Sequence, residues 1–246
     1  MTNEINFNDA IEILPGVYWI GFFDDESKLN SNPYLIVEED EAILIDPGSI
    51  PDFPVVMRKI IDVISPDKIS TIIAAHQDPD VCGNLPVMED VIHRDDLKIV
   101  AHSTTLRLIY HLGIKSKLYA VDEHDYQLTL RSGRILKFIF TPYLHSPGAI
   151  ATYDTQTKSL FSSDIFGSLS KSRDLFAGSD FPGTMEKWHQ SIMPSNALLQ
   201  PAMNRFRAME IERILPQHGS LIDTPQVATA IDHLAQLPCG IDLMQE

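Results

Sequence analysis

The chain has 246 residues, of which 44% are hydrophobic and 22% charged, an ordinary globular composition. Its formal net charge of −15 argues against binding to nucleic acid or to an anionic membrane, because phosphate groups would be repelled. The polar start MTNEINFNDA lacks the basic and apolar regions of a secretory signal, and no apolar run is long enough to span a membrane. Only two cysteines occur, Cys82 and Cys239, so a disulfide framework is unlikely and we expect a cytoplasmic protein. No linker divides the sequence, so we expect a single domain over residues 1–246.

Predicted strands and helices alternate along the first half of the chain. In chain order, apolar periodicity and turn residues predict a strand over 16–22, a hairpin over 33–49, a helix over 54–64, a buried strand over 69–75, a helix over 86–93, a strand over 98–103 and a helix over 104–112. Ser103 is predicted to cap the last of these helices, which stops at Gly113.

The second half changes from strands to helices. The sequence predicts strands within 116–121, 126–130, 135–142 and 149–164, helices over 185–193 and 197–210, a strand over 212–217 and a last helix over 224–237. Two sheets covered by helices, in a four-layer αββα order of the α/β (α+β) class, would accommodate this mixture.

Four of the predicted strands end in a residue that can bind a metal ion. Each is followed within three positions by a glycine or a proline, and the four residues are His76, His145, Asp164 and His218. Strand ends lie on a rigid scaffold while the loops after them can vary, so functional sites often form there. The repeated pattern predicts one shared site more strongly than any single histidine does.

The segment AAHQDPDVCG adds two candidates, Asp78 and Asp80, at alternate positions after His76. In an extended loop stiffened by Pro79, the three side chains would point the same way. The simpler alternative is a solvated acidic turn, since aspartates beside a proline are common in turns. The other strand-end residues make a metal site the better interpretation.

The candidates together supply three imidazoles and three carboxylates. This set exceeds the four ligands of one tetrahedral structural zinc and suits two metal ions that share a carboxylate. Mixed nitrogen and oxygen ligands rich in carboxylates favour iron or manganese, although zinc also binds such sites. With three aspartates, two trivalent ions would keep a net charge of about +3, which would stabilise an added dianion such as peroxide.

These residues resemble the metallo-β-lactamase superfamily, and within it the diiron domain of flavodiiron proteins. The resemblance covers nearly the whole chain and depends on the combined order of NPYLIVEEDEAILIDPGS, HSPGAIATYD, LFSSDIFG, WHQSIMP and RILPQHG. It implies the αββα fold and a ligand set for two irons: His76, Asp78 and His145 for one, Asp80 and His218 for the other, and Asp164 bridging them.

Two positions distinguish this sequence within the superfamily. Hydrolytic members usually have a histidine where Asp78 stands, so the carboxylate favours iron. The family normally has another histidine, bound to the second iron, at the position that Val81 occupies here. The resemblance therefore implies a second iron that is one ligand short.

Flavodiiron proteins normally continue into a flavodoxin domain, whereas this sequence ends at Glu246 without a phosphate-cradling flavin loop. We therefore expect no flavin in this chain, and the resemblance is strongest to stand-alone oxygen-binding diiron proteins. It implies an oxygen sensor that binds dioxygen as a diferric–peroxo adduct, a signalling protein partner and a homodimer. Two alternatives stay open: a metal-dependent hydrolase, and a reductase of dioxygen or nitric oxide that is fed by a separate flavoprotein.

Three further residues lie near the predicted ligands or in a motif of the resemblance. Asp46 in LIDPG is predicted to orient a ligand or stabilise a turn rather than bind metal. His189 in MEKWHQSIM could face the metal pocket, although a structural role is the simpler interpretation. Cys82 is expected to be a small buried apolar residue rather than a redox-active thiol.

Overall fold

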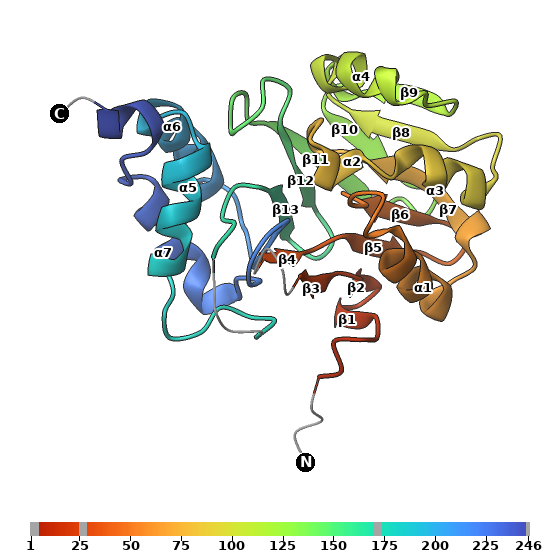
Figure 1. The fold of residues 1–246 in the computed structure, drawn as a ribbon, viewed down its shortest axis with the longest axis horizontal. Helices are drawn as coiled ribbons and strands as arrows, with labels where there is room; N and C mark the ends of the chain where they lie inside the picture. Colours follow the sequence, from red (N-terminus) through yellow and green to blue (C-terminus); the bar gives the residue numbers. More distant parts are fainter. Residues whose placement is uncertain (1–4, 25–28, 170–173, 245–246) are drawn as a thin grey trace. The chain divides into compact units, whose positions relative to one another are not determined.

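The structure is a computed structural model that describes residues 5–24, 29–169 and 174–244 (Figure 1). The chain forms two compact units, each assembled from two segments. Unit 1 contains the described residues up to Phe22 together with Ser31–Glu123, and unit 2 contains those of Phe23–Asn30 and His124–Glu246. Two short strands that pair with each other, β3 (Phe22–Asp24) and β4 (Leu29–Ser31), lie where the chain passes from one unit to the other.

Unit 1 is built on a seven-stranded sheet with the order β1-β2-β5-β6-β7-β8-β9. The predicted hairpin is confirmed as the antiparallel pair β5 and β6, closed by a hydrogen bond from the Glu38 N–H to the Glu41 carbonyl at 2.9 Å. From β6 to β9 neighbouring strands are parallel, because a helix connects each to the next. The strands are β1 (Ile11–Leu14), β2 (Val17–Trp19), β5 (Tyr34–Val37), β6 (Ala42–Ile45), β7 (Ile69–Ile73), β8 (Lys98–Ala101) and β9 (Lys117–Ala120).

The helices of unit 1 bury one apolar stripe each. In α1, a proline in the first turn suits the helix start, and Val56, Met57 and Ile60 form the buried stripe. This stripe joins side chains of the sheet in one apolar core. The helices are α1 (Phe53–Val63), α2 (Pro79–Cys82), α3 (Leu85–Ile92) and α4 (Ser103–Ile109), with 3₁₀ turns at Pro66–Lys68, Tyr110–Leu112 and Val121–Glu123. Because β6, β7 and β8 are parallel, the residues that follow them share one edge of the sheet.

The predicted cap of α4 is wrong. His102 occupies the N-cap position, and its Nδ1 accepts a hydrogen bond from the Thr104 N–H at 3.1 Å. Ser103 instead donates from its N–H and its hydroxyl to the carboxylate of Asp122, at 2.8 and 2.6 Å. A carboxylate distant in sequence thus engages the serine, and local capping preference could not reveal it.

Unit 2 is built on a five-stranded sheet with the order β10-β11-β12-β13-β14. Its strands are β10 (Gln127–Thr129), β11 (Ile135–Phe140), β12 (Ile150–Asp154), β13 (Ser159–Ser163) and β14 (Arg213–Pro216). All neighbours are antiparallel except β13 and β14, which are parallel. It follows that β11, β13 and β14 run in the same direction, so the segments after them leave from one edge of this sheet.

Three helices form the other layer of unit 2: α5 (Glu186–Ile192), α6 (Asn196–Arg207) and α7 (Thr224–Leu234), with 3₁₀ turns at Gly183–Met185 and Gly240–Met244. The predicted start of the last helix is confirmed, and Asp223 caps it by accepting from the Thr224 N–H at 3.0 Å. Figure 1 shows α6 and α7 in blue, and they pack against each other. Their apolar residues, among them Phe206 and Ile231, bury the strand residues Leu160 and Ile214 in a second core.

Each unit combines a sheet with helices, which confirms the mixed α/β class expected from the sequence. Among the described residues, no helix is both long enough and apolar enough to cross a bilayer.

Candidate metal centre

In unit 1, His76 and Asp78 lie shortly after β7 (Ile69–Ile73). The His76 side chain is buried, Asp78 is about one third exposed, and His76 Nε2 lies 3.7 Å from Asp78 Oδ2. The extended loop expected through residue 80 is wrong beyond Asp78, which has extended backbone angles and stands at the N-cap of α2. Pro79 starts the helix because its fixed φ suits the first turn, so Asp80 lies exposed on that turn.

Asp46 fixes the backbone that leads to His76. This buried residue follows β6 with a φ of 49°. Its N–H donates to the Ile73 carbonyl at 2.9 Å, and its Oδ1 accepts from the Ala75 N–H at 2.8 Å. These two bonds tie together the ends of β6 and β7.

Val81 and Cys82 both lie in the apolar core of unit 1, and neither is exposed. Burial raises the pKa of the Cys82 thiol to about 12, and the carboxylates of Asp46 and Asp78 add to the effect. The thiol therefore stays protonated at neutral pH, which confirms the expectation of a small buried residue. The backbone carbonyl of Val81 accepts a hydrogen bond from the Gly48 N–H at 3.1 Å.

Unit 2 brings His145, Asp164 and His218 together at one edge of its sheet. His145 Nε2 lies 2.8 Å from Asp164 Oδ2, and His218 Nε2 lies 3.7 Å from Asp164 Oδ1. Each oxygen of the carboxylate thus faces a different imidazole. Ligand atoms about 2.1 Å from a metal and adjacent in its coordination shell lie about 3 Å from each other, so this spacing is suited to a carboxylate shared by two ions.

The hydrogen bond at Nδ1 of His218 decides which ring nitrogen can bind a metal. Nδ1 lies 3.0 Å from the Asn30 carbonyl, which can only accept, so Nδ1 carries the proton and donates. In the neutral ring Nε2 then keeps its lone pair, directed at the Asp164 carboxylate. Two acceptors that face each other favour a proton or a metal ion between them, and the donor set fits a transition metal.

Asn30 was not foreseen from the sequence. It lies 188 residues before His218, and its side-chain amide also donates to the Gly219 carbonyl at 3.1 Å. No local pattern marks a backbone acceptor at such a separation. The contact depends on where β4 meets the segment after β14.

Helix α5 holds the loop that carries Asp164. Trp188 places its ring 4.9 Å from the His218 ring, and its Nε1–H donates to the Asp164 backbone carbonyl at 3.0 Å. A Cβ on Gly167 would come within 2.4 Å of Trp188 Nε1, so the close approach requires glycine there. Trp188 was not predicted to act at the site, although it stands next to His189 in WHQSIMP.

His189 acts on the same loop through both ring nitrogens. Nε2 accepts from the Phe166 N–H at 3.0 Å, and Nδ1 donates to the Met185 carbonyl at 2.7 Å. The ring is fully buried, and burial lowers its pKa to about 4, so it stays neutral. With both nitrogens engaged, His189 positions the chain after Asp164, in line with the structural interpretation.

Replacing Trp188 by leucine should weaken metal binding about 10- to 100-fold, the usual cost of losing a group that orients a ligand. Leucine removes both the ring against His218 and the hydrogen bond to Asp164. Trp188→Phe is the matched variant, since it keeps a ring and loses only the hydrogen-bond donor. Its affinity for iron should lie between those of the unaltered protein and Trp188→Leu. Titration of Fe²⁺ against a competing chelator measures the effect; equal affinities in all three proteins would show that Trp188 only packs.

Two solved structures resemble this chain over nearly their whole length. The peroxy diiron species of the chemotaxis sensor ODP is 27% identical, with a TM-score of 0.80, over 96% of this chain and 98% of that chain. The apo state of the chemotaxis sensor ODP from T. denticola is 27% identical, with a TM-score of 0.81, over 96% of both chains. This agreement confirms the metallo-β-lactamase type of fold expected from the sequence.

Curated relatives are longer proteins. An uncharacterized protein of Methanocaldococcus jannaschii is 27% identical over 85% of this chain and 56% of its own length. A putative diflavin flavoprotein of Synechocystis sp. is 26% identical over 81% of this chain and 35% of its own length. The nitric oxide reductase of Moorella thermoacetica is 23% identical over 86% of this chain and 57% of its own length. The chain thus spans about half of these relatives or less.

A family model completes the comparison. The model described as ODP family beta lactamase matches residues 29–219, well over half of the chain and all six predicted ligands. The chain therefore belongs to the ODP family of beta-lactamase-like proteins.

Proposed function

We propose that this chain binds two iron ions and dioxygen, and that it acts as an oxygen sensor. The proposal treats residues 1–246 as a single domain. The main supporting observation is the geometry of the Asp164 carboxylate, whose two oxygens face the imidazoles of His145 and His218. The likeness to a chemotaxis sensor solved as a peroxy diiron species gives it further support. The proposed ligands are His76, Asp78 and His145 for one iron, Asp80 and His218 for the other, and Asp164 for both.

A pair of ferrous ions would supply the electrons and the adjacent positive charges that dioxygen chemistry requires. The residues of the chain hold and tune that pair. Asp164 shares its charge between two positions, and the Asn30 carbonyl keeps Nε2 of His218 unprotonated for binding. Asp78 adds a second carboxylate beside His76, a ligand that suits iron better than a third imidazole would.

Anaerobic loading with Fe²⁺, followed by air, tests the proposal. We expect two irons per chain by metal analysis, Mössbauer spectra of a coupled pair, and a visible charge-transfer absorption that persists for minutes or longer. A protein that binds zinc in preference to iron and cleaves generic esters would contradict the proposal and support a hydrolase. Absence of any oxygen-dependent absorption would contradict the sensor function.

Reduction of nitric oxide is the second candidate, favoured by the relative from Moorella thermoacetica that is named for this activity. It would need electrons from a separate flavoprotein. The iron-loaded protein should therefore be supplied with a flavoprotein reductase and with either gas. Steady consumption of nitric oxide or dioxygen would support a reductase instead of a sensor. Binding of a single equivalent of gas, without turnover, would support the sensor.

Signalling requires two conformations with different affinities for dioxygen and a partner that distinguishes them. We propose that this partner is a signalling protein and that the chain works as a cytoplasmic homodimer. Sedimentation of the iron-loaded protein before and after exposure to air measures both the oligomeric state and any oxygen-dependent change.

Val81→His should lower the stability of the metal-free protein by about 1–3 kcal/mol, because an imidazole would replace a fully buried apolar side chain. On the proposed function, iron should recover part of that loss and change the lifetime of the oxygen-dependent absorption. Urea unfolding with and without iron, together with absorption decay, measures both. Val81→Ala, which loses packing without adding a ligand, should show no recovery; an identical response of the two variants would mean that residue 81 lies outside the iron shell.

A further inference from the structure

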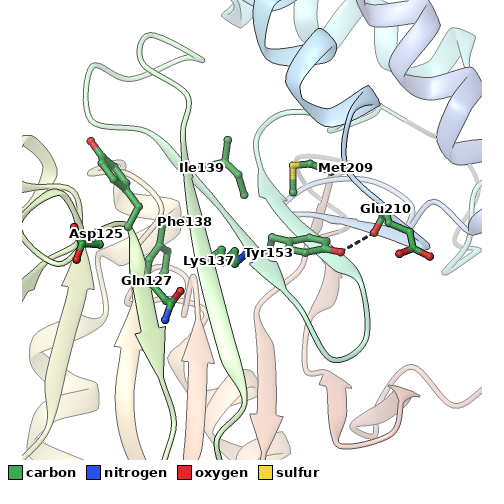
Figure 2. Close-up of a pocket in the computed structure, with 9 residues that line it drawn as sticks. Asp125, Gln127, Lys137, Phe138, Ile139, Tyr153, Met209 and Glu210 are labelled. Carbon is green, nitrogen blue, oxygen red and sulfur yellow. Dashed lines mark hydrogen bonds between the residues drawn. The ribbon is translucent and has the colours of Figure 1, made fainter.

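An open groove of about 560 Å³ lies on the sheet of unit 2 (Figure 2). Its floor is a row of side chains on neighbouring strands. Gln127 of β10 pairs with Lys137 of β11, and Lys137 pairs with Tyr153 of β12. Residues paired across a sheet point to the same face, so these three side chains lie side by side on the floor.

The same row shows why the groove exists. Beyond Tyr153 it continues to Leu160 and Ile214, which are fully buried beneath the helical layer. The row is therefore buried at β13 and β14 and becomes exposed toward Lys137 on β11. Ile139, two residues after Lys137 and on the same face, extends the apolar part of the floor.

The wall of the groove is held by a hydrogen bond. The Tyr153 hydroxyl donates to the Glu210 carbonyl at 2.7 Å, which anchors the turn after α6 against the sheet (Figure 2). Met209, on the same turn, also lines the groove and lies above Tyr153 in Figure 2. Burial and the nearby Glu210 raise the pKa of Tyr153, so the phenol remains a neutral donor.

Lys137 is the cation of this groove. Within the part of the chain that the structure describes, its ammonium group makes no ion pair or hydrogen bond. The Glu210 carboxylate points away from it in Figure 2 and pairs with Lys158 at 2.6 Å. Asp125, the other acidic lining residue, stands at the opposite rim. The chain has a net charge of −15, but Lys137 is a positive charge among the uncharged side chains of the groove floor.

We propose that this groove binds a small organic anion with a flat apolar body. Its anionic group would pair with Lys137, and its body would lie on Ile139, Met209 and the Tyr153 ring. A ligand that covers the ammonium without offering a charged acceptor would bind poorly, because desolvating a charge without a partner is costly. The volume falls within the range of small-molecule sites, and the lining mixes apolar side chains with polar and charged ones.

Calorimetric titration with 2-naphthoate, a flat aromatic carboxylate, tests the proposal on the iron-loaded protein kept without oxygen. We expect saturable binding of one molecule per chain, and at least tenfold weaker binding of the neutral analogue 2-naphthamide. Lys137→Met should weaken 2-naphthoate at least tenfold, about 1.4 kcal/mol, while it leaves the amide unchanged. Lys117→Met, at an exposed lysine on β9 of unit 1, is the matched control and should bind as the unaltered protein does.

A carboxylate could also bind to the irons, so an Asp164→Asn variant is titrated as well. We expect it to retain 2-naphthoate binding, and Lys137→Met to retain its full iron content. The proposal is overturned if Asp164→Asn abolishes binding, if Lys137→Met has no effect, if acid and amide bind alike, or if 2-naphthoate fails to bind at millimolar concentration. None of these results depends on whether the iron-loaded protein senses oxygen.

Discussion

Replacing Asp164 by asparagine should reduce the iron content from two ions per chain to one or fewer. Asparagine keeps the shape of the side chain but removes the charge and one acceptor oxygen that faces an imidazole. On the proposed function this residue serves both ions, so its loss should affect the whole site, whereas a terminal ligand would affect one ion. No other single change at the site should have a larger effect on iron binding.

The variant should still fold. The contacts from α5 to this loop reach its backbone, since Trp188 donates to the Asp164 carbonyl and His189 accepts from the Phe166 N–H. Iron per chain by metal analysis, with far-UV circular dichroism as the check on folding, measures the effect. Asp90→Asn is the matched control, because Asp90 is exposed and pairs with the exposed Lys115, and this variant should retain both irons. Retention of two irons by folded Asp164→Asn would contradict the shared role.

Arg134→Met should lower the free energy of unfolding by about 3–5 kcal/mol, the usual cost of leaving a buried charge without its partner. Arg134 and Asp154 are almost completely buried, and the guanidinium donates to both carboxylate oxygens, at 3.1 and 2.5 Å. Asp154 also accepts from the Gln156 N–H at 3.1 Å and from the Thr157 hydroxyl, so this carboxylate organises the turn between β12 and β13. Methionine keeps most of the arginine volume, so the loss should come from the charge rather than from a cavity.

Urea unfolding measures this effect, and Arg207→Met is its control. Arg207 pairs with Asp232 at 2.6 Å, but both side chains are about half exposed. Such surface pairs contribute about 0–1 kcal/mol. A similar loss in the two variants would show that burial does not determine the strength of the pair.

The pH dependence gives the second test of the same pair. Burial alone would raise the pKa of Asp154, but hydrogen bonds from Arg134 and Thr157 outweigh it and hold this pKa below its usual value. A depressed pKa in the folded state means that the pair stabilises the protein above the unfolded pKa of about 3.9, and that this contribution is lost as the pH falls through the lower folded value. The stability difference between the parent and Arg134→Met should therefore be full at pH 7 and shrink as the pH is lowered below 4. A constant difference across that range would contradict the role of the Asp154 charge.

Local patterns in the sequence were sufficient for most of the helices and strands and for naming the candidate ligands. The run Ile69–Ile73 is rich in β-branched residues and is buried at every position, as a central parallel strand requires. The candidate ligand near the end of a strand could be named because a turn signal, a glycine or a proline, comes within three residues after it. These are short-range features, and the hydrophobic and turn preferences of a few neighbouring residues decide them.

Only the tertiary structure decided which groups meet. The bond from His218 to Asn30, the ring of Trp188 on His218 and the engagement of Ser103 by Asp122 all join positions distant in sequence. Asp80 lies on a helix and not in the expected extended loop, because Pro79 can start a helix as readily as it stiffens a loop. The groove around Lys137 likewise depends on strand register and on where the helical layer ends, and local sequence patterns predict neither. Sequence alone therefore determined the chemistry available at the strand ends, whereas long-range pairing set the orientation, the proton positions and the supporting contacts.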